Sequence, residues 1–132
     1  MQTLSTPVVL VHVIAAVLAL VVGAAVFLRR KGTVTHVWFG RTWAILMLVV
    51  ALSSFWITGR DGLYSWIHGL SVLVTLAVPF GVFLAIRGQV SAHRKLMSGL
   101  YIGGLVIAGL FALSPNRMLG ELLWMSLGLV GA

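Results

Sequence analysis

The stretch VFLRRKGTVTH, residues 26–36, returns as VFLAIRGQVSAH, residues 82–93, and this duplication decides the fold. In each copy an apolar run is followed by basic residues and a glycine, and a histidine comes a few positions later. A second histidine precedes each copy, namely His12 in the first unit and His68 in the second. The four histidines of the chain therefore occupy equivalent places in two repeated units.

Composition identifies the class of protein before any motif is considered. Of the 132 residues, 61% are hydrophobic and only 8% are charged, and the mean hydropathy is +1.13. A soluble domain carries about 25% charged residues, so the chain is predicted to be an integral membrane protein. Its uncharged runs reach the roughly 18 residues that suggest a transmembrane helix. We expect four membrane helices over residues 7–28, 37–58, 63–86 and 95–113.

The connections between these helices are short, which favours antiparallel neighbours and an all-α, up-down four-helix bundle. The duplication divides a single membrane domain, residues 1–132, into two parallel helix hairpins, residues 7–58 and 63–113. A short apolar segment, residues 115–132, begins at Pro115. The sequence leaves open whether that segment is a half-helix, a helix in the membrane plane or a fifth helix on the flank of the bundle.

The net charge of +7 is distributed unevenly along the chain. Most basic residues border the first and third connections, whereas Arg60 and Arg117 lie elsewhere, near the two acidic residues. By the positive-inside rule, the first and third connections should be cytoplasmic and the amino terminus outside, in a bacterial inner membrane. Topology and anionic lipid explain such juxtamembrane clusters, so we expect the lipid bilayer and no nucleic acid as a partner. The clustered basic residues are Arg29, Arg30, Lys31, Arg41, Arg87, Arg94 and Lys95.

The duplication also predicts which histidines meet in space. In a four-helix bundle the first and third helices face each other across the interior, and so do the second and fourth. His12 and His68 are therefore expected to share a site near the outer surface, and His36 and His93 a site near the inner surface. Because a histidine is costly in a membrane segment, each of the four is a candidate functional residue.

Haem suits two pairs of histidines better than a bare metal ion does. A zinc or non-haem iron site normally needs a third protein ligand, and the only carboxylates, Asp61 and Glu121, are far from the inner pair in the sequence. Haem brings four equatorial ligands of its own, so two imidazoles complete it. Basic residues near the inner pair, including Arg41 and Arg94, could bind its propionates. We therefore expect one or two haem b groups, with the four histidines as iron ligands.

Histidines on consecutive helices, paired first with third and second with fourth, resemble the core of the di-haem transmembrane cytochromes b. That resemblance implies electron transfer between the membrane faces, with His12 and His68 on one haem and His36 and His93 on the other. Over nearly its full length, the chain is more closely similar to a family of small bacterial predicted membrane proteins, the domain of unknown function 2306. The segments that match it are His36-x-x-x-Gly40-Arg41, Leu52-Ser53-Ser54-Phe55, Trp66-Ile67-His68, His93-Arg94, Gly99-Leu100-Tyr101 and Ile107-Ala108-Gly109-Leu110-Phe111.

Three classes of function are compatible with these residues. The first is haem-based electron transfer, as an oxidoreductase that exchanges electrons with quinone or a small redox partner. The second is a proton or small-solute transport module that uses histidines as relays. The third is a structural or assembly subunit whose histidines only pack. The absence of cysteine excludes thiolate metal sites and iron–sulfur clusters with cysteine ligands, and the sequence leaves the oligomeric state open.

Overall fold

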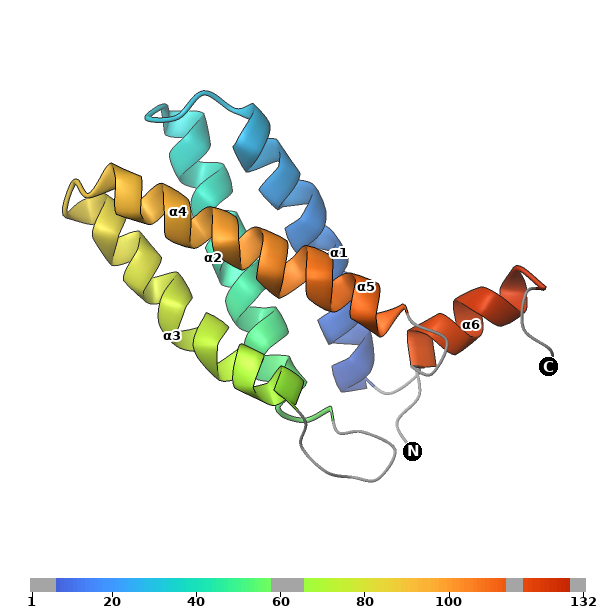
Figure 1. Ribbon diagram of the computed structural model, residues 1–132. Coiled ribbons are helices and arrows are strands. Elements are labelled where there is room, and N and C mark those ends of the chain that lie inside the picture. The colour runs from blue at the N-terminus through green and yellow to red at the C-terminus, as the bar shows by residue number, and fades with distance from the viewer. Residues whose placement is uncertain (1–6, 58–65, 114–117, 129–132) are drawn as a thin grey trace.

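The computed structural model describes residues 7–57, 66–113 and 118–128. Four of its helical stretches are long and apolar enough to cross a membrane, which confirms the predicted all-α membrane fold. The fourth stretch is a continuous helix that changes type along its length (Figure 1). The helices are α1 (Pro7–Leu28), α2 (Val34–Ser54), α3 (Trp66–Ile86), α4 (Val90–Tyr101), the π-helix η1 (Ile102–Ile107) and α5 (Ala108–Ala112).

Three of the predicted helix boundaries are wrong. Helix α2 begins at Val34 rather than at residue 37 and ends at Ser54 rather than at residue 58, and α4 begins at Val90 rather than at residue 95. The prediction started each helix close to its apolar run, but polar residues such as Thr35, Ser91 and Arg94 are also compatible with a helix on a polar face. The inner histidines therefore lie within the first turns of their helices rather than at the helix starts.

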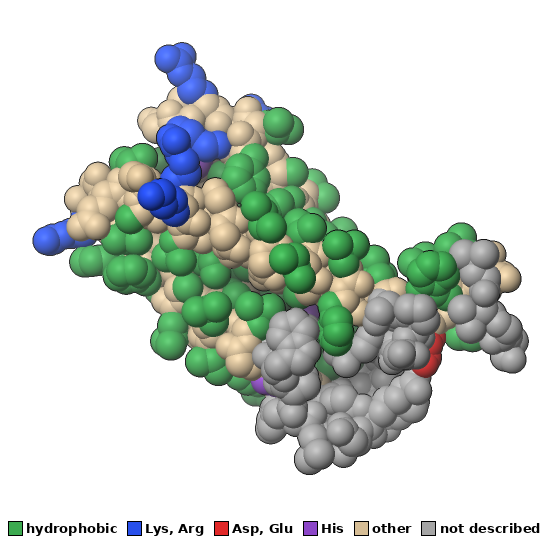
Figure 2. Space-filling model, in the orientation of Figure 1, with side chains coloured by type: hydrophobic (Ala, Val, Ile, Leu, Met, Phe, Trp, Pro, Cys, Tyr) green, Lys and Arg blue, Asp and Glu red, His purple; other side chains and the backbone are tan. Residues whose placement is uncertain are grey.

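The two basic turns keep the symmetry of the duplication. Gly32 between α1 and α2 has φ +80°, and Gly88 between α3 and α4 has φ +77°. Residues with a side chain rarely adopt this backbone conformation, so both copies of the repeat need glycine at this point. Both turns lie at the same end of the bundle, which we call the basic end (Figure 1; Figure 2).

The turns differ in how the next helix is capped. Thr33 precedes α2, and its side chain accepts a hydrogen bond from the backbone N–H of His36 at 3.2 Å. Gln89 precedes α4 and makes no such bond with its side chain. A capping side chain satisfies a backbone N–H that would otherwise have no partner in the helix. Only the first of the two equivalent turns therefore has a side-chain cap.

This difference allows a matched test of stability. Thr33→Ala should lower the free energy of unfolding by about 1 kcal/mol, because it removes the hydrogen bond to the His36 N–H. Gln89→Ala should change it little, because no cap is lost. Thermal unfolding of both variants in the same detergent measures the difference. Equal losses for the two variants would contradict the assigned cap.

The core of the bundle lies between the four membrane helices. Helix α4 and its continuation run across α1 and α2 in the view of Figure 1, while α3 stands beside them. Tyr101 at the end of α4 donates a hydrogen bond from its hydroxyl to the Leu20 carbonyl of α1 at 2.9 Å. Gly104 also packs close to Met47 and Val74. The buried core consists of Ala19, Trp43, Ala44, Met47, Ala51, Val74, Ala77, Val78, Leu100 and Leu105.

The carboxy-terminal apolar segment contains a short helix, α6 (Met118–Ser126). Its nine residues are far fewer than the roughly 20 that a spanning helix needs. The indole N–H of Trp124 donates to the Leu113 carbonyl at 3.0 Å, so α6 is attached to the end of the preceding helix. Figure 1 shows α6 to the side of the bundle, beyond α5. A fifth membrane-spanning helix is therefore not formed by the described part of this segment.

Candidate cofactor site

At the end opposite the basic turns, His12 bonds to α2 rather than standing free in the interior. Its Nδ1 lies 2.9 Å from the Ser53 hydroxyl oxygen. That hydroxyl donates to the Val50 carbonyl at 3.1 Å, so its oxygen is available to accept from the Nδ1–H of His12. In this arrangement the neutral ring keeps its unprotonated nitrogen at Nε2.

The symmetry-related histidine, His68, is bound to the segment that follows α2. It is only 8% exposed, and its Nε2 lies 2.8 Å from the Ile57 carbonyl oxygen, which can only accept. Nearby, the hydroxyls of Ser54 and Ser71 hydrogen-bond to each other across α2 and α3. We call His12, Ser53, Ser54, His68 and Ser71 the serine–histidine cluster. It joins the end of α2 to both α1 and α3.

At the basic end, His93 is held by the neighbouring helix α3. Its Nδ1 lies 2.8 Å from the Gly81 carbonyl oxygen, so Nδ1 must carry the proton and donate it. Nε2 is then the nitrogen that can offer an electron pair. A hydrogen bond from the other ring nitrogen to a backbone carbonyl is the usual way in which a metal-binding histidine is oriented.

His36 presents the opposite situation, because one of its ring nitrogens is buried without a hydrogen bond. No partner for its Nδ1 exists among the described residues. A buried polar atom without a partner costs about 1–3 kcal/mol, so such atoms point to a ligand, water or ion that satisfies them. His36 and His93 lie in the first turns of α2 and α4, and both helices begin at the basic end (Figure 1). The two inner histidines are therefore at the same end of the bundle.

The face of α2 that continues from His36 has room for a ligand. Gly40 and Trp43 follow at spacings of four and three residues, which place them on one side of a helix. A Cβ atom built on Gly40 meets nothing within 4 Å, and the indole Nε1 of Trp43 is buried without a partner among the described residues. We call His36, Gly40 and Trp43 the α2 cradle. It combines open space beside Gly40 with the unpartnered Nδ1 of His36, while the indole N–H of Trp43 faces the close contact with α1 at Gly23.

The basic residues near this cradle are mostly engaged elsewhere. The Lys31 ammonium donates to the carbonyls of Val26 and Phe27 at 2.7 and 3.1 Å, so it closes the end of α1. The Arg41 guanidinium is exposed and lies 5.2 Å from the centre of the Trp38 ring. Arg94 is exposed next to His93 on α4. Arg94 is thus open to an anionic group, whereas Arg41 lies on a surface aromatic ring.

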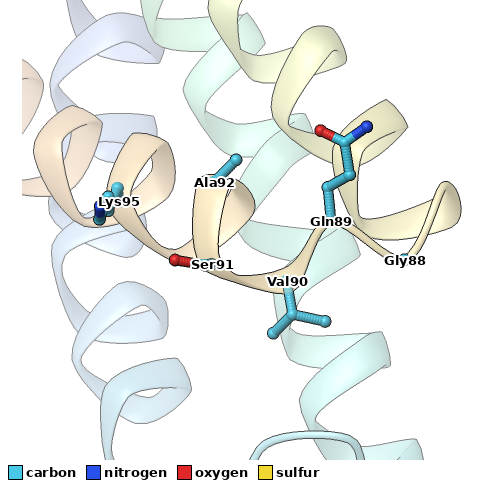
Figure 3. A pocket seen from close by; sticks show the side chains of 6 residues that line it. All are labelled: Gly88, Gln89, Val90, Ser91, Ala92 and Lys95. Atoms are coloured by element: carbon cyan, nitrogen blue, oxygen red, sulfur yellow. The ribbon is translucent and has the colours of Figure 1, made fainter.

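A hollow of about 590 Å³ lies at the α3–α4 turn, but its walls do not form a catalytic site. It is open to the surface, and Figure 3 shows the side chains of Gln89 and Val90 pointing in opposite directions. No group of three or more histidine, cysteine or acidic side chains among the described residues could hold a bare metal ion. The hollow is lined by Gly88, Gln89, Val90, Ser91, Ala92 and Lys95.

A comparison with protein families agrees with the membrane fold. Residues 9–109 match the model of the family described as predicted membrane protein, the domain of unknown function 2306. The chain belongs to this family. The matched range contains all four histidines. No curated protein and no solved structure matches the chain, so the family identifies a membrane protein without assigning a reaction.

Sequence reasoning did not single out Trp43, which is only 5% exposed and belongs to the core. The regular spacing of His36, Gly40, Trp43 and Met47 along one helix face was the available signal. The Gly81 carbonyl that orients His93 had no signal in the sequence, because every residue carries a backbone carbonyl.

Proposed function

We propose that the protein binds haem b at the basic end, with His36 and His93 as the iron ligands, and that it transfers electrons. The observation that carries the proposal is the buried Nδ1 of His36, which has no partner among the described residues and belongs to the same end of the bundle as the oriented imidazole of His93. Two imidazoles are the ligand set that haem requires of a protein. A bare metal ion would normally need a third protein ligand.

The residues around the pair have distinct parts in this proposal. The Gly81 carbonyl holds the Nδ1–H of His93 and leaves Nε2 as the donor nitrogen. His36 would supply the second nitrogen, and Gly40 leaves space beside it. Arg94 is the exposed cation that could bind a propionate. When bound, haem supplies reversible one-electron chemistry, which no side chain of this chain provides.

The serine–histidine cluster supports a different use of the outer pair. His12 bonds Ser53 of α2, His68 bonds the Ile57 carbonyl just after α2, and Ser54 joins α2 to α3. These contacts favour a structural role in which the outer histidines hold α1, α2 and α3 together, because hydrogen bonds between membrane helices stabilise their packing. A second haem between His12 and His68 stays a prediction from the duplication.

The charge distribution supports one orientation in the membrane. We infer that the basic end faces the cytoplasm of a bacterial inner membrane, since seven of the nine basic residues border the turns there. The seven are Arg29, Arg30, Lys31, Arg41, Arg87, Arg94 and Lys95. Quinone or a small redox molecule would be the partner with which the haem exchanges electrons.

Filling the α2 cradle tests the proposal without removing a ligand. The purified protein should take up added haemin with a new Soret absorption band, and Gly40→Leu should weaken this binding at least about tenfold, because a side chain would occupy the open space. Gly99→Leu is the matched control, since Gly99 also has nothing within 4 Å of its Cβ position but lies outside the cradle. Unchanged binding by Gly40→Leu, or no binding by the wild-type protein, would overturn the proposal.

A further inference from the structure

We propose that the perimeter of the basic end binds the headgroups of acidic phospholipids. The cations that carry this inference are Arg41 and Arg87, one from each copy of the repeat. The Arg41 guanidinium lies 5.2 Å from the centre of the Trp38 ring, and that of Arg87 lies 5.8 Å from the centre of the Phe83 ring. Both guanidinium groups are thereby positioned on an aromatic surface rather than spread freely into solvent.

The two rings face outward from the bundle. Trp38 is 61% exposed and Phe83 is 50% exposed, although both belong to membrane-spanning helices. Aromatic rings exposed near the ends of membrane helices sit at the level of the lipid headgroups. A cation lying over such a ring is therefore at the lipid-facing perimeter. It is outside the interior space in which a haem would lie, so this inference is independent of the proposed function.

The chain supplies no acidic partner for these cations. Its only acidic residues are Asp61, in the connection between α2 and α3, and Glu121 on α6. Neither belongs to the basic turns, and Figure 2 shows the basic side chains at the end of the molecule away from Glu121. The negative charge that balances the basic end must come from outside the chain. In a membrane, acidic lipid headgroups are the anions present at this level.

The α3–α4 turn adds a polar surface beside Arg87. The open hollow there is lined by Ser91 and Lys95 among others, and Figure 3 shows that these residues come from the start of α4. A phosphate group near Arg87 would be within a region that also offers a hydroxyl and an ammonium group. The shared ligand chemistry is a phosphate ester, and we assign it to a phospholipid because the aromatic rings place the site at the membrane.

Native mass spectrometry of the detergent-purified protein can measure lipid binding directly. We expect phosphatidylglycerol to bind more tightly than phosphatidylcholine, and the preference to shrink as salt is raised. The double variant R41Q/R87Q should weaken phosphatidylglycerol binding by about fivefold for each charge removed, because a basic residue near an anionic surface contributes about 1 kcal/mol. Its phosphatidylcholine binding should stay unchanged, which also shows that the variant is folded.

Arg60→Gln is the matched control, because it removes one positive charge in the connection between α2 and α3, outside the described residues and outside the basic turns. It should retain the wild-type preference. Equal binding of the two lipids by the wild-type protein would overturn the proposal, and so would an Arg60→Gln loss as large as that of R41Q/R87Q. Inorganic phosphate that binds as tightly as phosphatidylglycerol would also overturn it, because the site would then be one for a free anion.

Discussion

Gly23→Ala should lower the free energy of unfolding of the bundle by about 1–3 kcal/mol, the usual cost of overpacking a close-packed core. A Cβ atom at Gly23 would lie 2.3 Å from Cε2 and 2.5 Å from Cδ2 of Tyr101, and 2.8 Å from Nε1 of Trp43. The Tyr101 ring cannot withdraw without cost. Its hydroxyl is bonded to the Leu20 carbonyl at 2.9 Å, and its ring packs edge-on against Phe27 with centroids 5.0 Å apart.

Gly99→Ala provides the comparison for this stability loss. A Cβ atom there meets nothing within 4 Å, and alanine favours a helix by about 1 kcal/mol relative to glycine. Thermal unfolding in one detergent, followed by the elution profile of each heated sample, should show Gly23→Ala losing its folded peak first. If both variants unfold at the same temperature as the wild-type protein, α1 does not make the described close contact with Tyr101 and Trp43.

Loss of the inner histidines should remove haem from the protein almost completely. In the double variant H36A/H93A neither imidazole of the proposed site remains, and the rest of the chain offers no thiolate to replace them. The Soret absorbance per protein after haemin addition should fall to the level of a membrane protein that binds no haem. H12A/H68A should keep most of that absorbance, because those rings are bonded to Ser53 and to the Ile57 carbonyl at the other end of the bundle.

Measuring the stability of H12A/H68A also separates a structural role of the outer histidines from a role in haem binding. H12A/H68A removes two contacts between helices, so we expect a lower unfolding temperature together with retained haem. The reverse pattern, in which H12A/H68A loses haem and H36A/H93A keeps it, would contradict the assignment of the cofactor to the basic end. Elution of both variants as folded protein before haemin is added is the necessary control.

The sequence predicted the membrane class and the four spans, because these depend on composition and on the length of the apolar runs. The ends of α2 and α4 were wrong because apolar runs do not record where a polar helix start is capped, as Thr33 caps α2. The first and last residues of a helix thus depend on local hydrogen bonds. A hydropathy pattern gives no information about these bonds.

The environment of each histidine was beyond the reach of the sequence. The duplication treats His12 and His68 as equivalent, yet one bonds a serine hydroxyl through Nδ1 and the other a backbone carbonyl through Nε2. Such differences depend on the rotation of each helix about its axis and on the rotamer of each side chain. Arg41 illustrates the same limit, because its position in the sequence does not reveal that it lies over the exposed Trp38 ring.

The most direct test of the central claim is electron paramagnetic resonance of the purified protein loaded with one equivalent of ferric haem. Two imidazole ligands from His36 and His93 should give the signal of low-spin ferric iron, and either H36A or H93A should convert it to the high-spin signal of an iron with one axial histidine. A high-spin signal from the wild-type protein, or a low-spin signal that survives in both single variants, would contradict haem ligation by this pair.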